Sequence, residues 1–474
     1  MRYRVIPLCS LFFLSGCLVG PTYKTPLVKF PVSYSEQRCA EVTADLGCWW
    51  TFFEDHCLDD LIEKAIKNNY DLRIAIEKIA EMRADYQIKA ANLYPEIDMI
   101  AAVNRTKYSS NVFPSAVTTA PAGTAPAGST SSSTVYSYYN FGLDAWWEID
   151  FWGKLRHAKA GAYDEYQAQI ESARDVYLIL LGDVARTYVE IRALQKDSEL
   201  REQEVALEKR LLALTCERLC SGVASEIPDV QQVEAVDAAK SRLLIVRTAL
   251  TQAIIRLAVL LGENPEEFVL CSGARGVPMS KKMLEVGLPS DLLRRRPDIR
   301  QAERQLAAAT EYVGQAIAQW FPSFSLLGGI APESNSVSTW FTQGGLTWSI
   351  GPIVRWPVFN FGRINFNIDA KKSVERQAQL AYAKSVVYAL GDVENWLVTY
   401  FNEKKVVRVL QEKLTAATRE RYLNQALFAA GLVNETAFLQ SEKNCIEVEL
   451  ELIDAQMALS SAFIAVYKAL GGGW

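Results

Sequence analysis

Four stretches of the chain alternate between apolar and polar residues. In the clearest one, apolar side chains occupy every second position from Tyr139 to Phe151, and the positions between them include Asn140, Asp144 and Glu148. A period of two predicts a strand with one apolar face and one polar face. The predicted strands lie at about 96–104, 138–152, 323–331 and 345–358.

Proline cannot donate to a sheet ladder, so we expect a kink or a strand end near Pro352 in the last of these stretches.

A long helical pattern follows the second strand, and another follows the fourth. After Gly153 the chain has neither Pro nor paired Gly until about Cys220, and Gly362–Ala430 is equally long. Each run of roughly 67 residues corresponds to a helix near 100 Å long at 1.5 Å per residue. We expect Gly222 and Gly431 to end these helices in a left-handed conformation.

Shorter helices complete the pattern. They are predicted at about Leu58–Leu93, Pro228–Leu261 and Thr436–Leu470, and Tyr94-Pro95 ends the first of them.

The order of helix, strand, loop, strand, long helix, turn and helix occurs twice. Asp71-Leu72-Arg73 recurs as Asp298-Ile299-Arg300, and Tyr94-Pro95 recurs as Phe321-Pro322, both at an offset of 227 in residue number. Beyond the next loop the offset is 209, which relates Gly153 to Gly362, Gly222 to Gly431 and Leu261-Gly262 to Leu470-Gly471. The first copy carries its extra length in Ser109–Thr134, whose Ser, Thr, Ala, Pro and Gly content is typical of an exposed loop. Repeats of about 20 to 50 residues would indicate a solenoid, so this longer period indicates duplication of a whole unit.

The N-terminus has the pattern of a targeting segment. Arg2 and Arg4 precede an apolar stretch, and Leu14-Ser15-Gly16-Cys17 follows it. This ending resembles the bacterial lipobox, in which Cys17 is lipidated and becomes the first mature residue. Several acyl chains on one cysteine would hold far better than a single chain. Leu18 follows the cysteine, which in similar lipoproteins favours the outer membrane, and the alternative is a plain signal peptide with a chance cysteine.

Composition narrows the function further. Without residues 1–16 the chain has 48 basic and 55 acidic residues, a balance of −7, which argues against a nucleic-acid surface. Only two histidines occur, His56 and His157, and no Gly-rich phosphate loop or metal-ligand spacing is found. These absences argue against an enzyme, since general acid–base chemistry usually draws on histidine.

Seven cysteines remain beyond Cys9 and Cys17, so at least one is free or pairs between chains. Cys39 and Cys48 could close a small loop in an oxidising compartment. Cys216 and Cys220 lie four residues apart on one helical face, and we interpret them as buried or oxidisable structural thiols instead of metal ligands.

No stretch is predicted to cross a membrane as a helix, because Arg247 and Arg256 interrupt the best candidate, Leu243–Leu261. The amphipathic strands could form a soluble sheet over a core. Their length of about ten residues, their terminal aromatic residues and their charged polar face favour strands that cross a membrane instead. Four strands cannot close a barrel, and small barrels need about eight, so several copies must associate.

The ordered motifs resemble the outer-membrane efflux protein family, in the lipoprotein branch that serves resistance-nodulation-division pumps. They are Gly20-Pro21-Thr22-Tyr23-Lys24-Thr25-Pro26, Trp49-Trp50 with Phe53-Glu54-Asp55, Asp150-Phe151-Trp152-Gly153-Lys154-Leu155-Arg156 and Gly222-Val223-Ala224-Ser225. The resemblance implies an α+β membrane protein with four transmembrane strands and long periplasmic helices per chain. It also implies a trimer, in which a 12-stranded β-barrel is continued by an α-helical barrel.

The resemblance also implies a site at the periplasmic tip. Acidic side chains just beyond the glycine turns narrow the pore in the family, and Asp229 matches that position in the first copy. Gln440 stands at the corresponding place in the second copy, so the ring of charge is thinner here, and Glu226 and Glu435 could substitute. Phe428 is assigned to the same gate, and Arg218, Gly222 and Gly431 are assigned to the helix turns that dock an adaptor. The alternative is that these acids are solvated helix-end residues, which the helix dipole favours regardless of function.

The resulting prediction is an outer-membrane exit duct of a tripartite efflux pump, without catalytic activity and without a cofactor other than the lipid on Cys17. Its implied partners are two further copies, a periplasmic adaptor and an inner-membrane transporter. The alternatives are the outer-membrane component of a type I protein or peptide exporter, and a periplasmic coiled-coil lipoprotein. The predicted organisation is a signal peptide at 1–16, a lipid-anchored segment at 17–57, repeats at 58–270 and 291–474, and a linker at 271–290. The transported substrate is left open.

Overall fold

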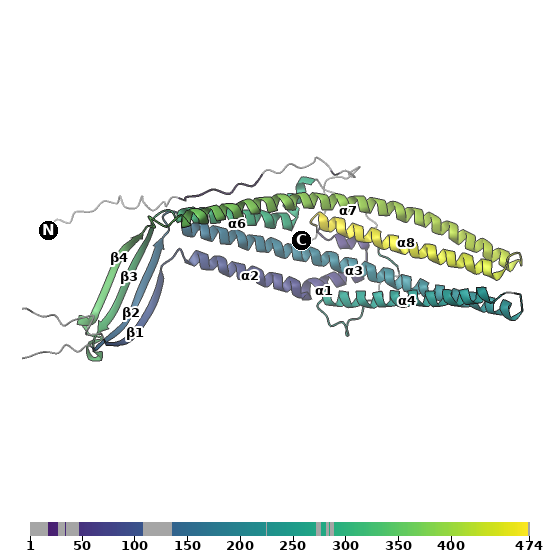
Figure 1. Ribbon diagram of the computed structural model, residues 1–474, viewed down its shortest axis with the longest axis horizontal. Coiled ribbons are helices and arrows are strands. Elements are labelled where there is room, and N and C mark those ends of the chain that lie inside the picture. The colour runs from purple at the N-terminus through teal and green to yellow at the C-terminus, as the bar shows by residue number, and fades with distance from the viewer. Residues whose placement is uncertain are drawn as a thin grey trace, which may run out of the picture. The chain divides into compact units, whose positions relative to one another are not determined.

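The computed structural model describes residues 18–26, 34, 47–107, 135–223, 225–271, 276–280, 284 and 289–472. The predicted signal peptide, Cys17, Cys39 and the Ser109–Thr134 loop lie outside these residues. The described α-helices and strands, all but α5 labelled in Figure 1, are α1 His56–Asn68, α2 Tyr70–Ala91, β1 Glu96–Lys107, β2 Val135–Ile149, α3 Lys154–Cys220, α4 Glu226–Leu260, α5 Leu292–Arg295, α6 Pro297–Ala318, β3 Ser323–Ser334, β4 Leu346–Arg355, α7 Arg363–Ala429 and α8 Glu435–Ala469.

The predicted duplication is confirmed by the bounds of these elements. The pairs α2 and α6, and β1 and β3, have equal lengths, and their first residues are related by the offset of 227. The pairs α3 and α7, and α4 and α8, also have equal lengths, and their first residues are related by the offset of 209. The two long helices have 67 residues each, as their patterns predict.

The chain forms two compact units, and each unit draws on both copies of the repeat. The first comprises Met1–Lys24, Met82–Glu165 and Leu306–Gln377, and contains the sheet. The second comprises Thr25–Glu81, Tyr166–Gln305 and Ala378–Trp474, and contains most of the helical residues.

In the first unit the four strands form one antiparallel sheet in the order β1-β2-β3-β4 (Figure 1). β1 and β4 are therefore its edges, and neither has a second strand partner within the described chain. The expectation of a kink or strand end near Pro352 is wrong, because β4 continues to Arg355 and Pro352 is paired with Leu326. Within the single chain β4 pairs with β3 alone, so at Pro352 the strand lacks one N–H but the ladder with β3 continues on both sides of it.

In the second unit the predicted helix Leu58–Leu93 is interrupted, which corrects that prediction. Asn69 leaves the helical conformation, with φ −59° and ψ 129°, and separates α1 from α2. Its side chain accepts a hydrogen bond of 2.9 Å from the N–H of Leu72 and donates one of 2.8 Å to the carbonyl of Leu260. One residue thus caps the start of α2 and the end of α4.

Arg296 occupies the equivalent place in the second copy. Its guanidinium donates to the carbonyl of Ala469 at the end of α8 over 2.9 Å and forms ion pairs with Asp298 and Asp392. Both copies therefore join the start of one helix to the end of another through a single polar side chain, although the side chain differs.

The core of the second unit lies between α3, α8 and the residues that precede α1. Trp49 is fully buried and stacks on Tyr467, with 6.1 Å between ring centroids. Further along, α3 and α8 share an apolar cluster of Ala193, Leu200, Ile446, Leu450 and Ile453. Aromatic and aliphatic burial of this kind is the main stabilising term of such a unit.

Candidate channel wall and periplasmic tip

The two faces of the sheet differ in chemistry. The register places Ile97, Met99, Val103, Trp348 and Ile350 on one face, together with Trp147 and Leu326. The first five of these side chains are 65–70% exposed in the single chain. An apolar face of this size in water would be unfavourable, so it is suited to lipid.

The opposite face of the sheet is acidic. Its charged residues on the described strands are Glu96, Asp98, Asp144, Glu148, Glu333 and Arg355. Asp98 and Asp144 are direct cross-strand partners, and both are exposed. Two like charges placed opposite each other destabilise a sheet, so this pairing indicates a requirement other than stability.

A pocket of 590 Å³ opens where the strands end, and it lies wholly within the first unit. Carboxylates and cations both line it, among them Glu148, Asp150, Arg355 and Arg363. Glu148 is paired with Lys154 over 2.7 Å, and Asp150 with Arg156 over 3.1 Å. The strand ends are thus polar on the face that carries the acids.

In the second unit, both long helices end as the sequence predicts. Gly222 has φ +73° and Gly431 has φ +74°, and each turn is closed by hydrogen bonds such as that from the N–H of Val223 to the carbonyl of Arg218. A Cβ on either glycine would meet no atom within 4 Å. Glycine is therefore required there by the backbone conformation and not by space.

Two arginines of α3 join it to α8 beside these turns. Arg218 donates a hydrogen bond of 2.8 Å to Thr436, and Arg210 forms an ion pair of 2.7 Å with Glu435. Arg210 and Arg218 are eight residues apart and so lie near one another on the same helix face. Arg218 is predicted from the sequence at the turn, whereas Arg210 and Thr436 are not, and the eight-residue spacing of the two arginines is the signal that could have indicated Arg210.

The predicted gate residues differ in their surroundings. Asp229 is half-buried in the first turn of α4 and accepts a long hydrogen bond of 3.5 Å from Thr215. Glu226 and Gln440 are exposed, and Phe428 stacks on Phe438 with 5.9 Å between centroids. Glu435, which was predicted to supply charge to the pore, is neutralised by Arg210 within the chain. Among the four polar gate candidates, Asp229 is thus the half-buried carboxylate that forms no ion pair with another described residue.

We predict that Asp229→Ala channels in planar bilayers have higher conductance and lower cation selectivity, because the tip loses a held negative charge. Gln440→Ala, at the corresponding position of the second copy, is the matched control and should change neither. Unchanged conductance and selectivity in Asp229→Ala would exclude Asp229 from the gate.

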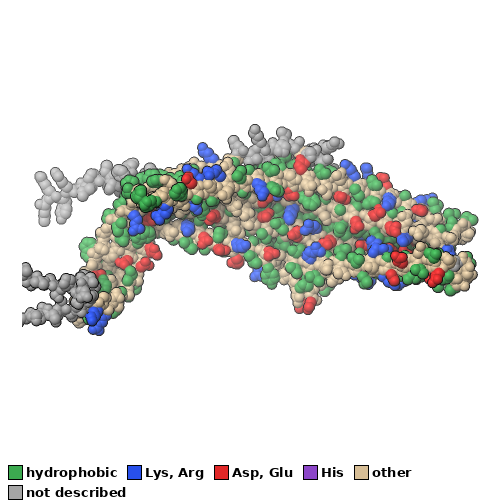
Figure 2. All heavy atoms as spheres, viewed as in Figure 1, with side chains coloured by type: hydrophobic (Ala, Val, Ile, Leu, Met, Phe, Trp, Pro, Cys, Tyr) green, Lys and Arg blue, Asp and Glu red, His purple; other side chains and the backbone are tan. Residues whose placement is uncertain are grey.

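Two described helices, α4 and α8, are long and apolar enough by composition to cross a membrane. Ion pairs fix α4 against α3 along much of its length, from Arg242 with Glu204 to Arg256 with Glu190. Figure 2 shows acidic and basic side chains mixed over the helices, and such charges are costly in the centre of a membrane span.

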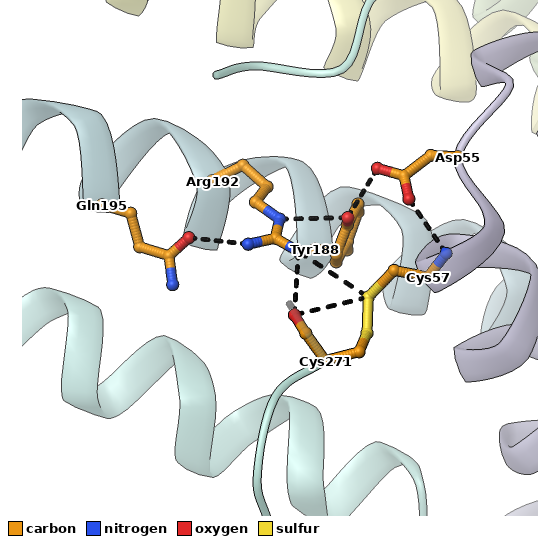
Figure 3. Close-up of a disulfide and its surroundings, with 6 residues drawn as sticks. All are labelled: Asp55, Cys57, Tyr188, Arg192, Gln195 and Cys271. Atoms are coloured by element: carbon orange, nitrogen blue, oxygen red, sulfur yellow. Dashed lines mark hydrogen bonds between the residues drawn. A yellow bond between two sulfur atoms is a disulfide. The ribbon is translucent and has the colours of Figure 1, made fainter. Parts of the chain in front are cut away.

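A disulfide that the sequence did not identify lies in the second unit. Cys57 at the start of α1 is bonded to Cys271, and Arg192 donates to the carbonyl of Cys271 over 3.1 Å (Figure 3). Tyr188 donates to Asp55 over 2.6 Å and accepts from Arg192 over 3.0 Å. Burial, together with the hydrogen bond to Asp55, raises the pKa of Tyr188, so the phenol stays protonated and can donate.

The other described cysteines are free thiols, which bears on the cysteine predictions. Cys48 is a free, exposed thiol, so it does not pair with Cys39. Cys216 and Cys220 are also free and are exposed, so the buried alternative for them is wrong and the oxidisable one stays a prediction. The prediction of at least one free thiol is confirmed.

Comparison with known proteins decides the family. The model of the family described as "Outer membrane efflux protein" matches residues 61–263 and 288–472. The chain belongs to the outer membrane efflux protein family.

Relatives within this family match along their whole length. The solvent efflux pump outer membrane protein SrpC of Pseudomonas putida is 29% identical, over 100% of this chain and 99% of SrpC. The cation efflux system protein CusC of Escherichia coli (strain K12) is 27% identical, over 99% of both chains. The solved open state of the MtrE outer-membrane channel of Neisseria gonorrhoeae superposes with a TM-score of 0.83 at 26% identity, and the match covers 96% of this chain and 98% of MtrE.

These matches confirm the predicted family, the fold of outer-membrane efflux channels and the location in the outer membrane. In this chain the acidic face of the sheet is the candidate channel wall, and the Gly222 and Gly431 turns form the candidate tip. Cys17, the predicted lipidation site, lies outside the described residues.

Proposed function

We propose that three copies of this chain form the exit duct of a tripartite efflux pump, through which substrates pass passively to the exterior. The sheet carries the proposal, because it combines two free edges, an exposed apolar face and an acidic face. Edges that are left open in lipid cost several kcal/mol per unpaired backbone group. Three chains of four strands each give twelve strands, and cyclic symmetry closes them into one barrel.

The partners follow from this role. A periplasmic adaptor would dock on the Gly222 and Gly431 turns, beside Arg218, and an inner-membrane resistance-nodulation-division transporter would supply the energy. We further propose that Cys17 carries acyl chains that anchor the mature chain in the outer membrane, since Leu14-Ser15-Gly16-Cys17 has the form of a lipobox. The duct would have no catalytic activity and would need no cofactor besides this lipid.

The cargo is proposed to be small and preferentially cationic or neutral. The charged residues of the wall on the described strands are five acids and one base, and Glu148 alone among the acids has a neighbouring lysine, Lys154, as an ion-pair partner. In a bore of limited width, such a charge balance raises the local concentration of cations and lowers that of anions. SrpC is named for solvents and CusC for cations, so both classes occur among relatives.

Reconstitution in planar bilayers tests the role and the wall together. The full-length protein should conduct with cation selectivity, and an Asp98→Asn, Asp144→Asn double variant should keep its conductance but lose part of that selectivity. Arg105→Gln on the other face of the sheet is the matched control and should retain the selectivity. A protein that neither conducts nor migrates as a heat-sensitive oligomer would exclude the duct.

Cross-linking in membranes, followed by identification of the bound adaptor, tests the partners. Recovery of a resistance-nodulation-division adaptor supports the proposed pump. Recovery of a type I exporter adaptor instead would assign the duct to protein or peptide secretion.

A further inference from the structure

Within the described chain, β1 and β4 each have one side without a neighbouring strand. The repeat provides a template for the strand pairing on that side. β1 is the first-copy equivalent of β3, and β4 is the second-copy equivalent of β2. The contact between β2 and β3 within one chain is therefore the internal template for a contact between β4 of one chain and β1 of the next chain. The missing partner of each edge is thus a second copy of this chain.

The template fixes a register. In β2 and β3, Ile149 pairs with Phe324, and Trp147 pairs with Leu326. Replacing each residue by its equivalent in the other copy of the repeat gives Val358 opposite Ile97 and Trp356 opposite Met99. This register brings the apolar faces of both strands to the same side of the barrel, whereas a slip of one residue would reverse one of them.

The end of β4 fits this assignment. β1 pairs with β2 only as far as Trp146, so Trp147–Ile149 are held by β3 alone. The equivalent residues of the second copy, 356–358, lie beyond the end of β4, and Val358 is 78% exposed. Within the single chain the N–H of Val358 donates to the carbonyl of Trp356 over 2.9 Å across Pro357, so pairing with the next chain extends β4 only if this short turn opens.

An aromatic contact just beyond the strands follows the same rule. Trp152 stacks on Phe321 with 4.6 Å between ring centroids, and its indole N–H donates to the carbonyl of Pro322 over 2.8 Å. The equivalents of Trp152 and Phe321 are Phe361 and Tyr94, which are 85% and 72% exposed. The pair Trp152 and Phe321 is thus packed within the chain, whereas the equivalent pair, Phe361 and Tyr94, is uncovered.

The backbone at Phe361 is strained, unlike that at its equivalent Trp152, which does not have a positive φ. Its φ of +51° is in the left-handed region, which bulky residues rarely adopt. Such a conformation is unfavourable and persists only where surrounding contacts hold it. The ring contact that Phe361 makes in the described chain is with the exposed Phe359.

From the template and the uncovered side chains of Val358, Phe361 and Tyr94, we infer that adjacent chains join with Val358 opposite Ile97, and that Phe361 of one chain packs on Tyr94 of the next. This inference rests on the proposed function, because it assumes the closed ring of copies. It adds the residues and the register of the joint.

Cysteine pairs test the register in full-length protein whose Cys39, Cys48, Cys216, Cys220 and Cys445 are replaced by serine. Val358→Cys with Ile97→Cys should form a covalent trimer on mild oxidation, since directly opposed Cβ atoms lie about 4.5–5.5 Å apart. Val358→Cys with Ala101→Cys, four residues out of register, is the control and should give little product. Preferential cross-linking of the control pair, or of neither pair in a conducting trimer, would overturn the register while leaving the duct intact.

The aromatic contact is tested by heat stability of the oligomer in detergent. Phe361→Ala and Tyr94→Ala should each lower the temperature at which the trimer dissociates, and the double variant should lose no more than the larger single effect. Phe359→Ala is the control. Additive losses from Phe361→Ala and Tyr94→Ala would show that the two rings do not touch. A monomeric, non-conducting wild type would instead refute the duct itself.

Discussion

A Cys57→Ser, Cys271→Ser double variant is expected to be less stable than the wild type by about 2–5 kcal/mol, the usual cost of removing a native disulfide. The bond joins residues 214 apart, so in the unfolded chain it closes a very long loop and removes much conformational freedom. It also holds the chain that follows α4 against the start of α1. Loss of the bond should therefore loosen this part of the second unit first.

Thermal unfolding in detergent, followed by tryptophan fluorescence with and without reductant, measures the effect. The wild type under reductant should approach the double variant, and the double variant should not respond to reductant. Cys445→Ser, which removes a buried free thiol, is the control and should keep the full response to reductant. Equal unfolding of wild type and double variant under oxidising conditions would show that the bond does not form.

Hydrogen bonds, and not packing alone, hold the disulfide in place. Arg192 bonds the carbonyl of Cys271 and the hydroxyl of Tyr188, which in turn bonds Asp55. These contacts hold both ends of the cross-link on α3 and lie in the first copy alone, because Tyr188 and Arg192 correspond to Leu397 and Phe401 in the second. The two repeats thus share their helices and strands, but the second repeat lacks the Tyr188 and Arg192 side chains that make these hydrogen bonds.

The sequence predicted the elements that a periodic pattern defines. The strands, the 67-residue helices and the glycine turns follow from side-chain period and from backbone conformations that glycine alone adopts freely. The repeat then fixed the order, because two copies with constant offsets must fold in the same way.

The sequence did not predict features that depend on contacts between distant residues. Asn69 is a residue type that caps helices, and it caps α2 locally through Leu72, but its bond to the end of α4 depends on Leu260, which lies 191 residues away. The partner of Cys57 could not be chosen among seven cysteines by spacing, because the fold alone brings Cys271 to it. For the same reason the Arg210–Glu435 pair was not anticipated, and with it the loss of Glu435 as a source of free charge.

An Arg210→Ala, Arg218→Ala double variant is expected to conduct more than the wild type, because these two side chains hold α3 to α8 beside the turns. One helical hairpin consists of α3 and α4, and the other of α7 and α8. Both contacts lie within one chain, so they set the distance between these two hairpins before any partner binds. In the Arg218 contact the donor is charged. A hydrogen bond of this kind stabilises by about 1.5 kcal/mol at the low end of its range. A loss of that size raises the ratio of open to closed tips about tenfold.

Single-channel recording in planar bilayers measures this as a higher open probability, and the single variants should show smaller increases. Arg247→Ala is the matched control, because it removes an exposed pair between α3 and α4, with Glu202, that does not join the two hairpins. High salt should weaken the Arg210–Glu435 pair by screening, but should affect the hydrogen bond from Arg218 to the neutral Thr436 far less. Salt should therefore reproduce only part of the effect of the double variant. If the double variant had the same open probability as the wild type, the tip would be held closed by contacts between copies, and Asp229 would be the residue to examine next.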